Sequence, residues 1–137
     1  MKLTGIIAIS GKPGLFTVVK QGKNNVIVQS VETGRKSPAF ATDRISALED
    51  ISIYTYEGDE LLSTVFQAIY EKENGGEAIS HKAEAKELES YLREVLPEYD
   101  EDRVRISDIK KIFQWYNSLH KAGIIKAAAE LAVAEEE

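Results

Sequence analysis

The chain has 137 residues, of which 43% are hydrophobic and 29% charged, and its formal net charge is −6. This length and composition predict one globular domain, or two very small ones that share a core. No run approaches the roughly 20 apolar residues needed to span a bilayer, and the N-terminus lacks the pattern of a secretory signal. We therefore expect a cytoplasmic protein with no membrane partner. The absence of cysteine excludes disulfides, thiolate catalysis and cysteine-ligated metal centres.

Charge is divided unevenly along the chain. Residues 1–57 carry seven basic and five acidic side chains, whereas residues 58–137 carry ten basic and eighteen acidic ones. An acidic body repels a phosphate backbone, so broad nonspecific DNA binding is disfavoured. A local basic face on the first half is still compatible with this distribution.

Residues 1–57 predict five short strands joined by tight turns. The expected strands span residues 4–10, 15–20, 26–31, 38–42 and 51–54, with turns rich in glycine and asparagine between them. Asp43 can cap a single helical turn over 44–48, and the alternation around Ile51 and Ile53 points both isoleucines inward. Consecutive hairpins, a helical turn and a closing strand predict a five-stranded antiparallel SH3-like small barrel as a domain at residues 1–57. Such barrels usually bind other molecules rather than transform them.

Several strings carry a more specific resemblance. They are residues 5–16 (GIIAISGKPGLF), 38–41 (PAFA), 45–55 (ISALEDISIYT), 107–112 (SDIKKI) and 115–117 (WYN). Together they resemble a family of small uncharacterised bacterial proteins known as a domain of unknown function, and the resemblance covers most of the chain. It implies no activity. The first turn is also shorter than the recognition loop of signalling SH3 domains, which disfavours binding of proline motifs.

Beyond residue 59 the apolar spacing changes to that of helices. Asp59 can cap a helix that starts at Glu60 and stops at residues 74–76, and Ser80 can cap a second helix that Pro97 ends. A short extended segment is expected at residues 103–106.

The third predicted helix starts at Ser107 and ends at Gly123. It has the strongest apolar face in the chain, formed by Ile109, Ile112, Phe113, Tyr116 and Leu119. A final helix over residues 124–134 is expected to fade into the acidic tail 135–137.

The two halves are expected to pack on each other. A barrel of this size is near the lower limit for independent stability, so the first helix should dock on it through Leu62 or Phe66. The junction at residues 56–59 is too short to let the halves move independently. The predicted class is therefore α+β: the barrel, then a helical domain at residues 58–137 with a bundle of about four helices.

Few residues suggest a site for chemistry. His81 has helical spacing to Glu77 and Glu84, which is compatible with metal ligation, but the glycines before Glu77 indicate that this residue precedes the helix. His81 and His120 lie far apart in sequence and have no nearby partner pattern. Ser-Gly-Lys at residues 10–12 lacks the further glycines and the following helix of a phosphate loop. We therefore expect no catalytic residue, no metal site and no cofactor.

Three features indicate a binding role. Aromatic residues lie on the predicted barrel strands, where they fill the core or form a recognition surface, and basic residues on the turns could form a rim. Trp115 lies off the main apolar stripe of its helix, so it is either a second packing face against the barrel, which we favour, or an exposed anchor for a partner. The candidate partner-binding residues are Lys12, Phe16, Lys23, Arg35, Lys36, Phe40, Tyr54, Tyr56 and Trp115.

The leading hypothesis is a nonenzymatic cytoplasmic interaction module whose barrel binds a protein or peptide, while the helical half supports it or forms a homodimer. The alternative is binding of RNA or DNA through the basic turns, an argument from fold analogy. An enzyme of unknown class that uses His81 or His120 is the third hypothesis.

Overall fold

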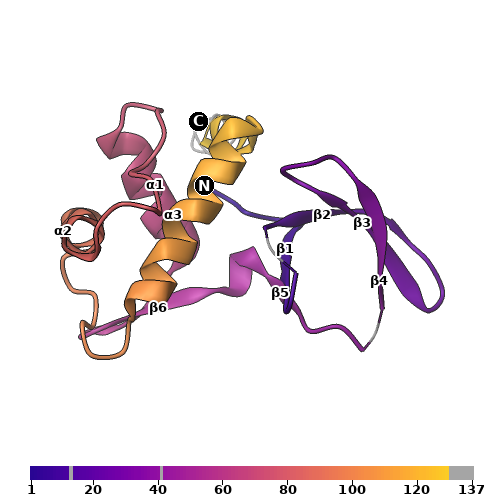
Figure 1. The fold of residues 1–137 in the computed structure, drawn as a ribbon, viewed down its shortest axis with the longest axis horizontal. Coiled ribbons are helices and arrows are strands. Elements are labelled where there is room, and N and C mark those ends of the chain that lie inside the picture. The colour runs from indigo at the N-terminus through magenta and orange to yellow at the C-terminus, as the bar shows by residue number, and fades with distance from the viewer. Residues whose placement is uncertain (13, 41, 130–137) are drawn as a thin grey trace.

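The computed structural model describes residues 1–12, 14–40 and 42–129 and has an α+β fold. A five-stranded antiparallel sheet occupies one side of the molecule and the helices occupy the other (Figure 1). The sheet strands are β1 (Ile6–Ile9), β2 (Phe16–Gln21), β3 (Asn25–Ser30), β4 (Lys36–Phe40) and β5 (Ile45–Ala47). The helices are α1 (Leu62–Lys72), α2 (Ala85–Val95) and α3 (Ile106–Lys121), and residues 124–129 are also helical. The expected class and the antiparallel five-stranded sheet are confirmed.

The sheet has the strand order β4-β3-β2-β1-β5, so the last strand pairs with the first. Side chains alternate between its two faces. On β1, Ile6 and Ala8 face the helices, whereas Ile7 and Ile9 point to the opposite, inner face of the sheet. The buried residues of this inner-face cluster are Ile7, Ile9, Phe16, Val28 and Ala39. Strand β1 is therefore covered on both sides, which explains its run of isoleucines.

The fifth strand differs from the one predicted. Residues 45–47 form β5 rather than a helical turn, because Ile45 and Ala47 pair with β1 opposite Ile9 and Ile7 and take its free edge. The turn comes later, as the single 3-10 turn η1 (Leu48–Asp50). Asp43 does not cap it: the Asp43 Oδ2 atom accepts a hydrogen bond from the Phe40 backbone N–H at 2.8 Å.

The expected closing strand at residues 51–54 is β6 (Ser52–Thr55), and it pairs with β7 (Gly58–Leu61) instead of the sheet. The predicted helix start at Glu60 is therefore wrong, because residues 58–61 complete a hairpin before α1 begins at Leu62. Ile53 is buried as expected, whereas Ile51 is only partly buried against the core. The expected domain boundary at residue 57 lies in the turn of this hairpin.

The later helices follow the predicted faces but not all of the predicted starts. Helix α2 begins at Ala85 rather than after Ser80. The extended segment expected at 103–106 is wrong, because the Arg103 and Val104 N–H groups both donate to the Asp100 carbonyl in a turn, and α3 begins at Ile106. The Asp108 carboxylate accepts a hydrogen bond from the Arg105 backbone N–H, which ends the preceding loop and starts the helix. Gly123, with φ +79°, ends α3 as predicted. Residues 130–134 of the expected final helix and the acidic tail lie outside the described residues.

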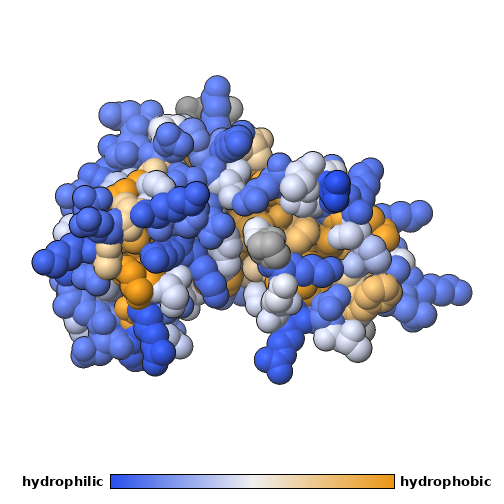
Figure 2. Space-filling view, in the orientation of Figure 1, coloured by the Kyte–Doolittle hydropathy of each residue, from blue (hydrophilic) through white to orange (hydrophobic). Residues whose placement is uncertain are grey.

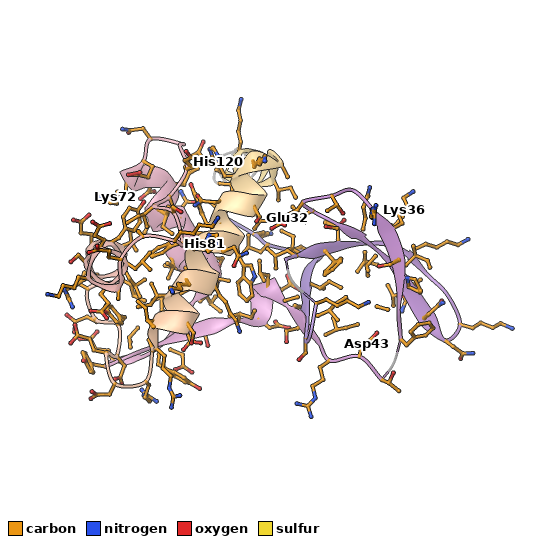
Figure 3. The ribbon with its side chains drawn as sticks, viewed as in Figure 1. Glu32, Lys36, Asp43, Lys72, His81 and His120 are labelled. Atoms are coloured by element: carbon orange, nitrogen blue, oxygen red, sulfur yellow. The ribbon has the colours of Figure 1, made fainter. Side chains whose placement is uncertain are left out.

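One main core joins the sheet to the helices. Leu62 and Phe66 of α1 are fully buried in it together with Leu3, Leu15 and Leu48 from the first 50 residues, so the docking of the first helix is confirmed. The predicted apolar face of α3 is buried in the same core. A polar contact supports this junction: the Ser118 hydroxyl donates to Glu32 Oε1 at 2.7 Å, and Figure 3 shows Glu32 on the sheet side facing α3.

Candidate partner-binding groove

Large hydrophobic side chains are exposed in two regions of the molecule. Much of the surface in Figure 2 is hydrophilic, but hydrophobic residues reach the surface over both the helical half and the sheet. Those on the β6–β7 hairpin are Tyr54, Tyr56 and Leu61. Those on the sheet are Val18, Val19, Phe40 and Ile45.

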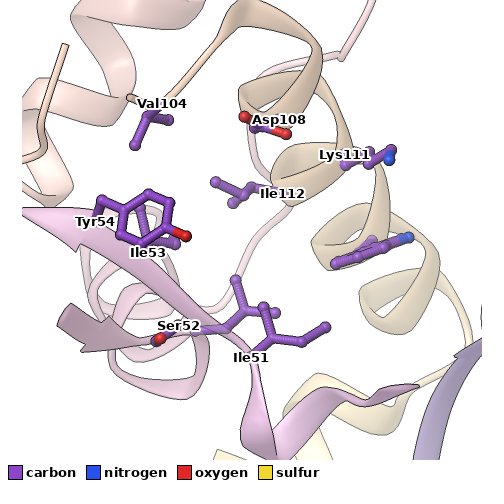
Figure 4. Close-up of a pocket in the computed structure, with 10 residues that line it drawn as sticks. Ile51, Ser52, Ile53, Tyr54, Val104, Asp108, Lys111 and Ile112 are labelled. Atoms are coloured by element: carbon purple, nitrogen blue, oxygen red, sulfur yellow. The ribbon is translucent and has the colours of Figure 1, made fainter. Parts of the chain in front are cut away.

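Of the hairpin residues, Tyr54 adjoins a depression of about 250 Å³ between β6 and α3, which we call the groove (Figure 4). Its floor is apolar because β6 and the first half of α3 both turn hydrophobic residues toward the shared core. The apolar lining residues are Ile51, Ile53, Leu62, Val104 and Ile112. The rim is formed by Ser52, Tyr54, Asp108, Lys111 and Trp115.

Tyr54 is held in place at the rim by a charged neighbour. Its side chain is 47% exposed, and the Arg103 guanidinium lies 4.5 Å from the centre of its ring. Arg103 Nε in turn donates to Asp100 Oδ2 at 2.8 Å. This hydrogen bond lowers the pKa of the Asp100 carboxyl below its ordinary value. Tyr54 is thus an ordered aromatic surface.

The segment at residues 98–101 covers one end of the β6 edge. The Asp100 backbone N–H donates to the Tyr54 carbonyl, and the Tyr56 N–H donates to the Glu98 carbonyl, both at 2.9 Å. The Tyr56 hydroxyl accepts a hydrogen bond from the Glu101 backbone N–H. This end of the strand is therefore already paired.

The two rim charges differ in how far they are already engaged. Asp108 accepts the hydrogen bond at the start of α3, whereas Lys111 makes no hydrogen bond or ion pair with the described residues. Trp115 is half-buried against the main core, as we favoured, and its remaining surface faces the groove. Lys111 is therefore the rim charge available to a ligand.

A second depression of about 460 Å³ continues the groove toward the turn after β1. It shares Ile51, Lys111 and Trp115 with the groove and reaches Lys12 at its other end. The two depressions together run from β6 to the first turn of the sheet. Such a path is long enough for several residues of an extended chain.

A third depression, of about 840 Å³, brings together residues that the sequence keeps far apart. His81, His120, Glu77 and Glu32 all line it, and Figure 3 shows both histidines near α3. His120 Nε2 lies 2.9 Å from the Gly75 carbonyl, so this nitrogen carries the proton and donates. Among the described residues, no three histidine or acidic side chains are placed to hold a metal ion.

Tyr116 lies behind this third depression. Its hydroxyl donates to the Gly76 carbonyl at 3.0 Å, and its ring stacks on His120 with the centroids 6.2 Å apart. Burial raises the pKa of Tyr116 to about 12. His120 is thus part of a packed contact rather than a free base.

The chain matches two protein families and a solved structure. Residues 51–119, just over half of the chain, match a family described as Domain of unknown function (DUF6852). The chain belongs to this family. Residues 3–48 match a second family, Domain of unknown function (DUF5606). The two matches meet at η1, which separates the sheet from the β6–β7 hairpin.

A solved structure supports the same relationship. The DUF6852 chain is 47% identical to a Bacteroides vulgatus protein whose solution NMR structure was a structural genomics target, with a TM-score of 0.72. The match covers 89% of this chain and 88% of that one. No curated protein matches the chain. The resemblance noted in the sequence is therefore confirmed, and it assigns no activity.

The structure separates the candidate binding residues into three groups. Lys12, Tyr54 and Trp115 lie along the groove and its extension. Phe16 is buried in the inner-face cluster, so it fills the core. The remaining candidates, which are exposed elsewhere, are Lys23, Arg35, Lys36, Phe40 and Tyr56.

Sequence reasoning missed Lys111, Asp108 and Val104 as groove residues. Lys111 and Trp115 have the i, i+4 spacing that places two side chains on one helix face, and this signal was present in the sequence. The β6 side of the groove could not be paired with them from sequence, since about 50 residues of chain separate the two walls.

Proposed function

We propose that this chain is a nonenzymatic module that binds an extended segment of a protein or peptide partner in the groove between β6 and α3. The observation that carries the proposal is an open apolar depression flanked by two aromatic residues, Tyr54 and Trp115. The cation at its rim, Lys111, makes no ion pair with the described residues. Apolar pockets with a few placed polar groups are the usual form of a binding site.

The lining specifies the chemistry of the ligand. A bulky apolar side chain would fill the floor between Ile53 and Ile112, and a carboxylate next to it in the partner would pair with Lys111. Tyr54 and Trp115 would bury against the same segment, and such aromatic residues carry much of the energy of protein interfaces. The preferred partner sequence is therefore a large apolar residue beside an acidic one.

The ionisable groups of the groove support binding rather than catalysis. They are Tyr54, Asp108 and Lys111, and Asp108 is engaged in the cap of α3. Nucleophilic and acid–base catalysis need an activating partner within hydrogen-bond reach, and the groove lining offers no such pair.

The architecture of the sheet agrees with this role. We propose that it is an SH3-like small barrel, because its last strand pairs with its first, a 3-10 turn follows, and the inner face has its own buried cluster. We also propose a cytoplasmic location. Within the described part of the chain, no helix combines the length and apolarity that a membrane span requires.

Selection from a random peptide library on the purified chain tests the proposal. We expect enriched peptides that pair a bulky apolar residue with an acidic one. Trp115→Ala should weaken their binding by about tenfold or more, because it truncates a central aromatic contact. Lys111→Ala should weaken it less, through the carboxylate alone.

Lys110→Ala is the matched control, since Lys110 is the exposed neighbour of Lys111 on α3 but does not line the groove. Equal effects of Lys110→Ala and Lys111→Ala would contradict the proposal. So would enriched peptides that shift the NMR signals of protein amides away from the groove. Light scattering of the same samples detects the outcome in which a second copy of the chain occupies the groove.

A further inference from the structure

The outer face of β2, β3 and β4 lies at the end of the molecule away from the helices (Figure 1). Cross-strand partners share a face, so the strand register shows which side chains lie there. One row across the strands is Thr17, Gln29 and Lys36, and the next is Lys20, Ile27 and Pro38. Asn25 and Phe40 form a third. This set is called the outer sheet face below.

A β-bulge puts a lysine on this face. The pairing of β2 with β3 shifts between Val18 and Lys20, so that Val19 is inserted and Lys20 pairs with Ile27. Regular pairing would have placed Lys20 opposite Val26, on the inner face beside the buried cluster. Bulges commonly redirect a side chain in this way.

The outer sheet face and its adjoining turns are basic. Residues 15–40 contain four cationic side chains, Lys20, Lys23, Arg35 and Lys36, and a single acidic one, Glu32, and the turn after β4 adds one of each sign, Asp43 and Arg44. Glu32 is engaged by Ser118 of α3. None of the four cations forms an ion pair with the described part of the chain, and all four are exposed. Figure 3 places Lys36 at the end of the molecule away from the helices. The local field therefore favours an anionic ligand.

An aromatic ring lies among these charges. Phe40 is 50% exposed, and its ring makes no aromatic or cation–π contact with the described residues. Pro38 and Ile27 extend the apolar surface beside it along the same face. The register places Phe40 one row from Lys20 and two rows from Lys36 on this face. An exposed ring near lysines is the combination on which nucleic-acid bases stack while their phosphates are neutralised.

The edge of β4 has few free backbone N–H groups for the other main class of ligand, an added peptide strand. Ser30 N–H donates to the Arg35 carbonyl, and this register directs the Lys36, Pro38 and Phe40 backbone groups away from β3. Pro38 has no N–H to donate, and the Phe40 N–H already donates to Asp43. Of these three residues only Lys36 offers an N–H to an added strand, which disfavours extension of the sheet by an acidic peptide and favours a ligand that lies across the face.

We infer that the outer sheet face binds single-stranded nucleic acid, with a base stacked on Phe40 and phosphates paired with Lys20 and Lys36. The inference goes beyond the peptide groove and does not depend on it. The groove residues lie on β6 and α3, toward the other end of the molecule, so the two proposals fail separately.

Fluorescence anisotropy with labelled oligo(dT) and oligo(U) of about ten nucleotides tests this inference with the full chain. We expect measurable binding at about 50 mM salt that weakens at about 200 mM. The logarithm of the association constant should fall with the logarithm of the salt concentration, with a slope of about −0.7 per phosphate contact. Phe40→Ala should weaken binding about fivefold or more. The double variant Lys20→Glu/Lys36→Glu should weaken it on the order of tenfold or more and reduce the salt slope.

Lys82→Glu/Lys86→Glu is the charge-matched control for the double variant, because both lysines are exposed in the helical half, Lys82 before α2 and Lys86 on it. Circular dichroism confirms that each variant folds, and Phe40→Tyr, which keeps a stacking ring, should retain binding. The relative affinities of the two probes separate DNA from RNA as the source. Absence of binding at low salt, equal loss with the Lys82→Glu/Lys86→Glu control, or equal competition by polyglutamate would overturn the inference.

Discussion

The two buried clusters of this protein differ greatly in size. Among the described residues, the main core contains twenty buried ones drawn from both halves of the chain, whereas the inner-face cluster of the sheet contains five. Since apolar burial is the dominant favourable term in folding, most of the stability resides where the helices meet β1 and η1. The outer strands of the sheet depend on a small cluster and on their own hydrogen bonds. They should be the part of the described structure that opens first.

The largest effect should come from truncating the centre of the main core. Phe66 is fully buried, and its ring packs edge-on against Tyr116 with the centroids 5.5 Å apart. Phe66→Ala should lower the free energy of unfolding by about 3–5 kcal/mol, as measured by urea denaturation. A loss below about 1 kcal/mol would mean that the two halves do not share a core. If the variant does not fold, Ile69→Val on the same helix face gives a milder form of the test.

A smaller effect should follow from removing a polar clamp beside that core. The Asn117 side chain accepts a hydrogen bond from the Ala78 N–H at 2.7 Å and donates to the Ala78 and Ile79 carbonyls. Asn117→Ala should cost about 1–3 kcal/mol, because backbone groups are left without a partner. Thermal unfolding measures this loss. Asn117→Asp keeps the acceptor but not the donor, so its stability should lie between that of Asn117→Ala and that of the native chain.

The inner-face cluster should respond locally rather than globally. Ile9→Val removes one methylene group from this cluster and should cost about 0.5–1.5 kcal/mol. Hydrogen exchange should accelerate in β1 to β4 while the most protected amides of α1 and α3 keep their rates. Ile69→Val is the matched substitution in the main core. If both variants accelerate exchange everywhere, the molecule opens as a single unit and the comparison between the clusters fails.

The smallest effect concerns the segment that covers the β6 edge. The hydrogen bond from Arg103 lowers the pKa of Asp100 below its ordinary 3.8. A carboxyl whose pKa is lower in the folded state contributes stability above pH 3.8, and this contribution is lost as the pH falls through the folded-state value. NMR titration of the Asp100 carboxyl should show the lowered midpoint. Asp100→Asn should remove this part of the acid dependence, whereas an Asp102→Asn control should retain it.

Local signals in the sequence predict much of this fold. Short apolar runs between turns identify the first four strands, and the spacing of Ile109, Ile112, Phe113 and Tyr116 identifies the buried face of α3. The fifth strand could not be identified in this way. Asp43 is a good helix cap in isolation, and what makes residues 45–47 a strand is the edge of β1, far away in sequence. Long-range pairing overrides local preference there.

The candidate site was less predictable than the fold. Tyr54 and Trp115 were identified as aromatic residues without a clear core role, but their proximity depends on how the β6–β7 hairpin lies against α3. The sequence of the hairpin predicts a barrel strand followed by the start of a helix. Lys111 is of interest because it has no ion-pair partner among the described residues, which no spacing rule reveals.

The shortage of free backbone donors along the edge of β4 affects how the protein behaves at high concentration. A sheet edge with free backbone donors can pair with other copies of the chain, which then stack into fibrils. Pro38 at this border and the carboxylate of Asp43 beside it leave an incoming copy little to bind. The molecule therefore exposes an apolar, positively charged sheet face while limiting edge-to-edge pairing at the β4 border.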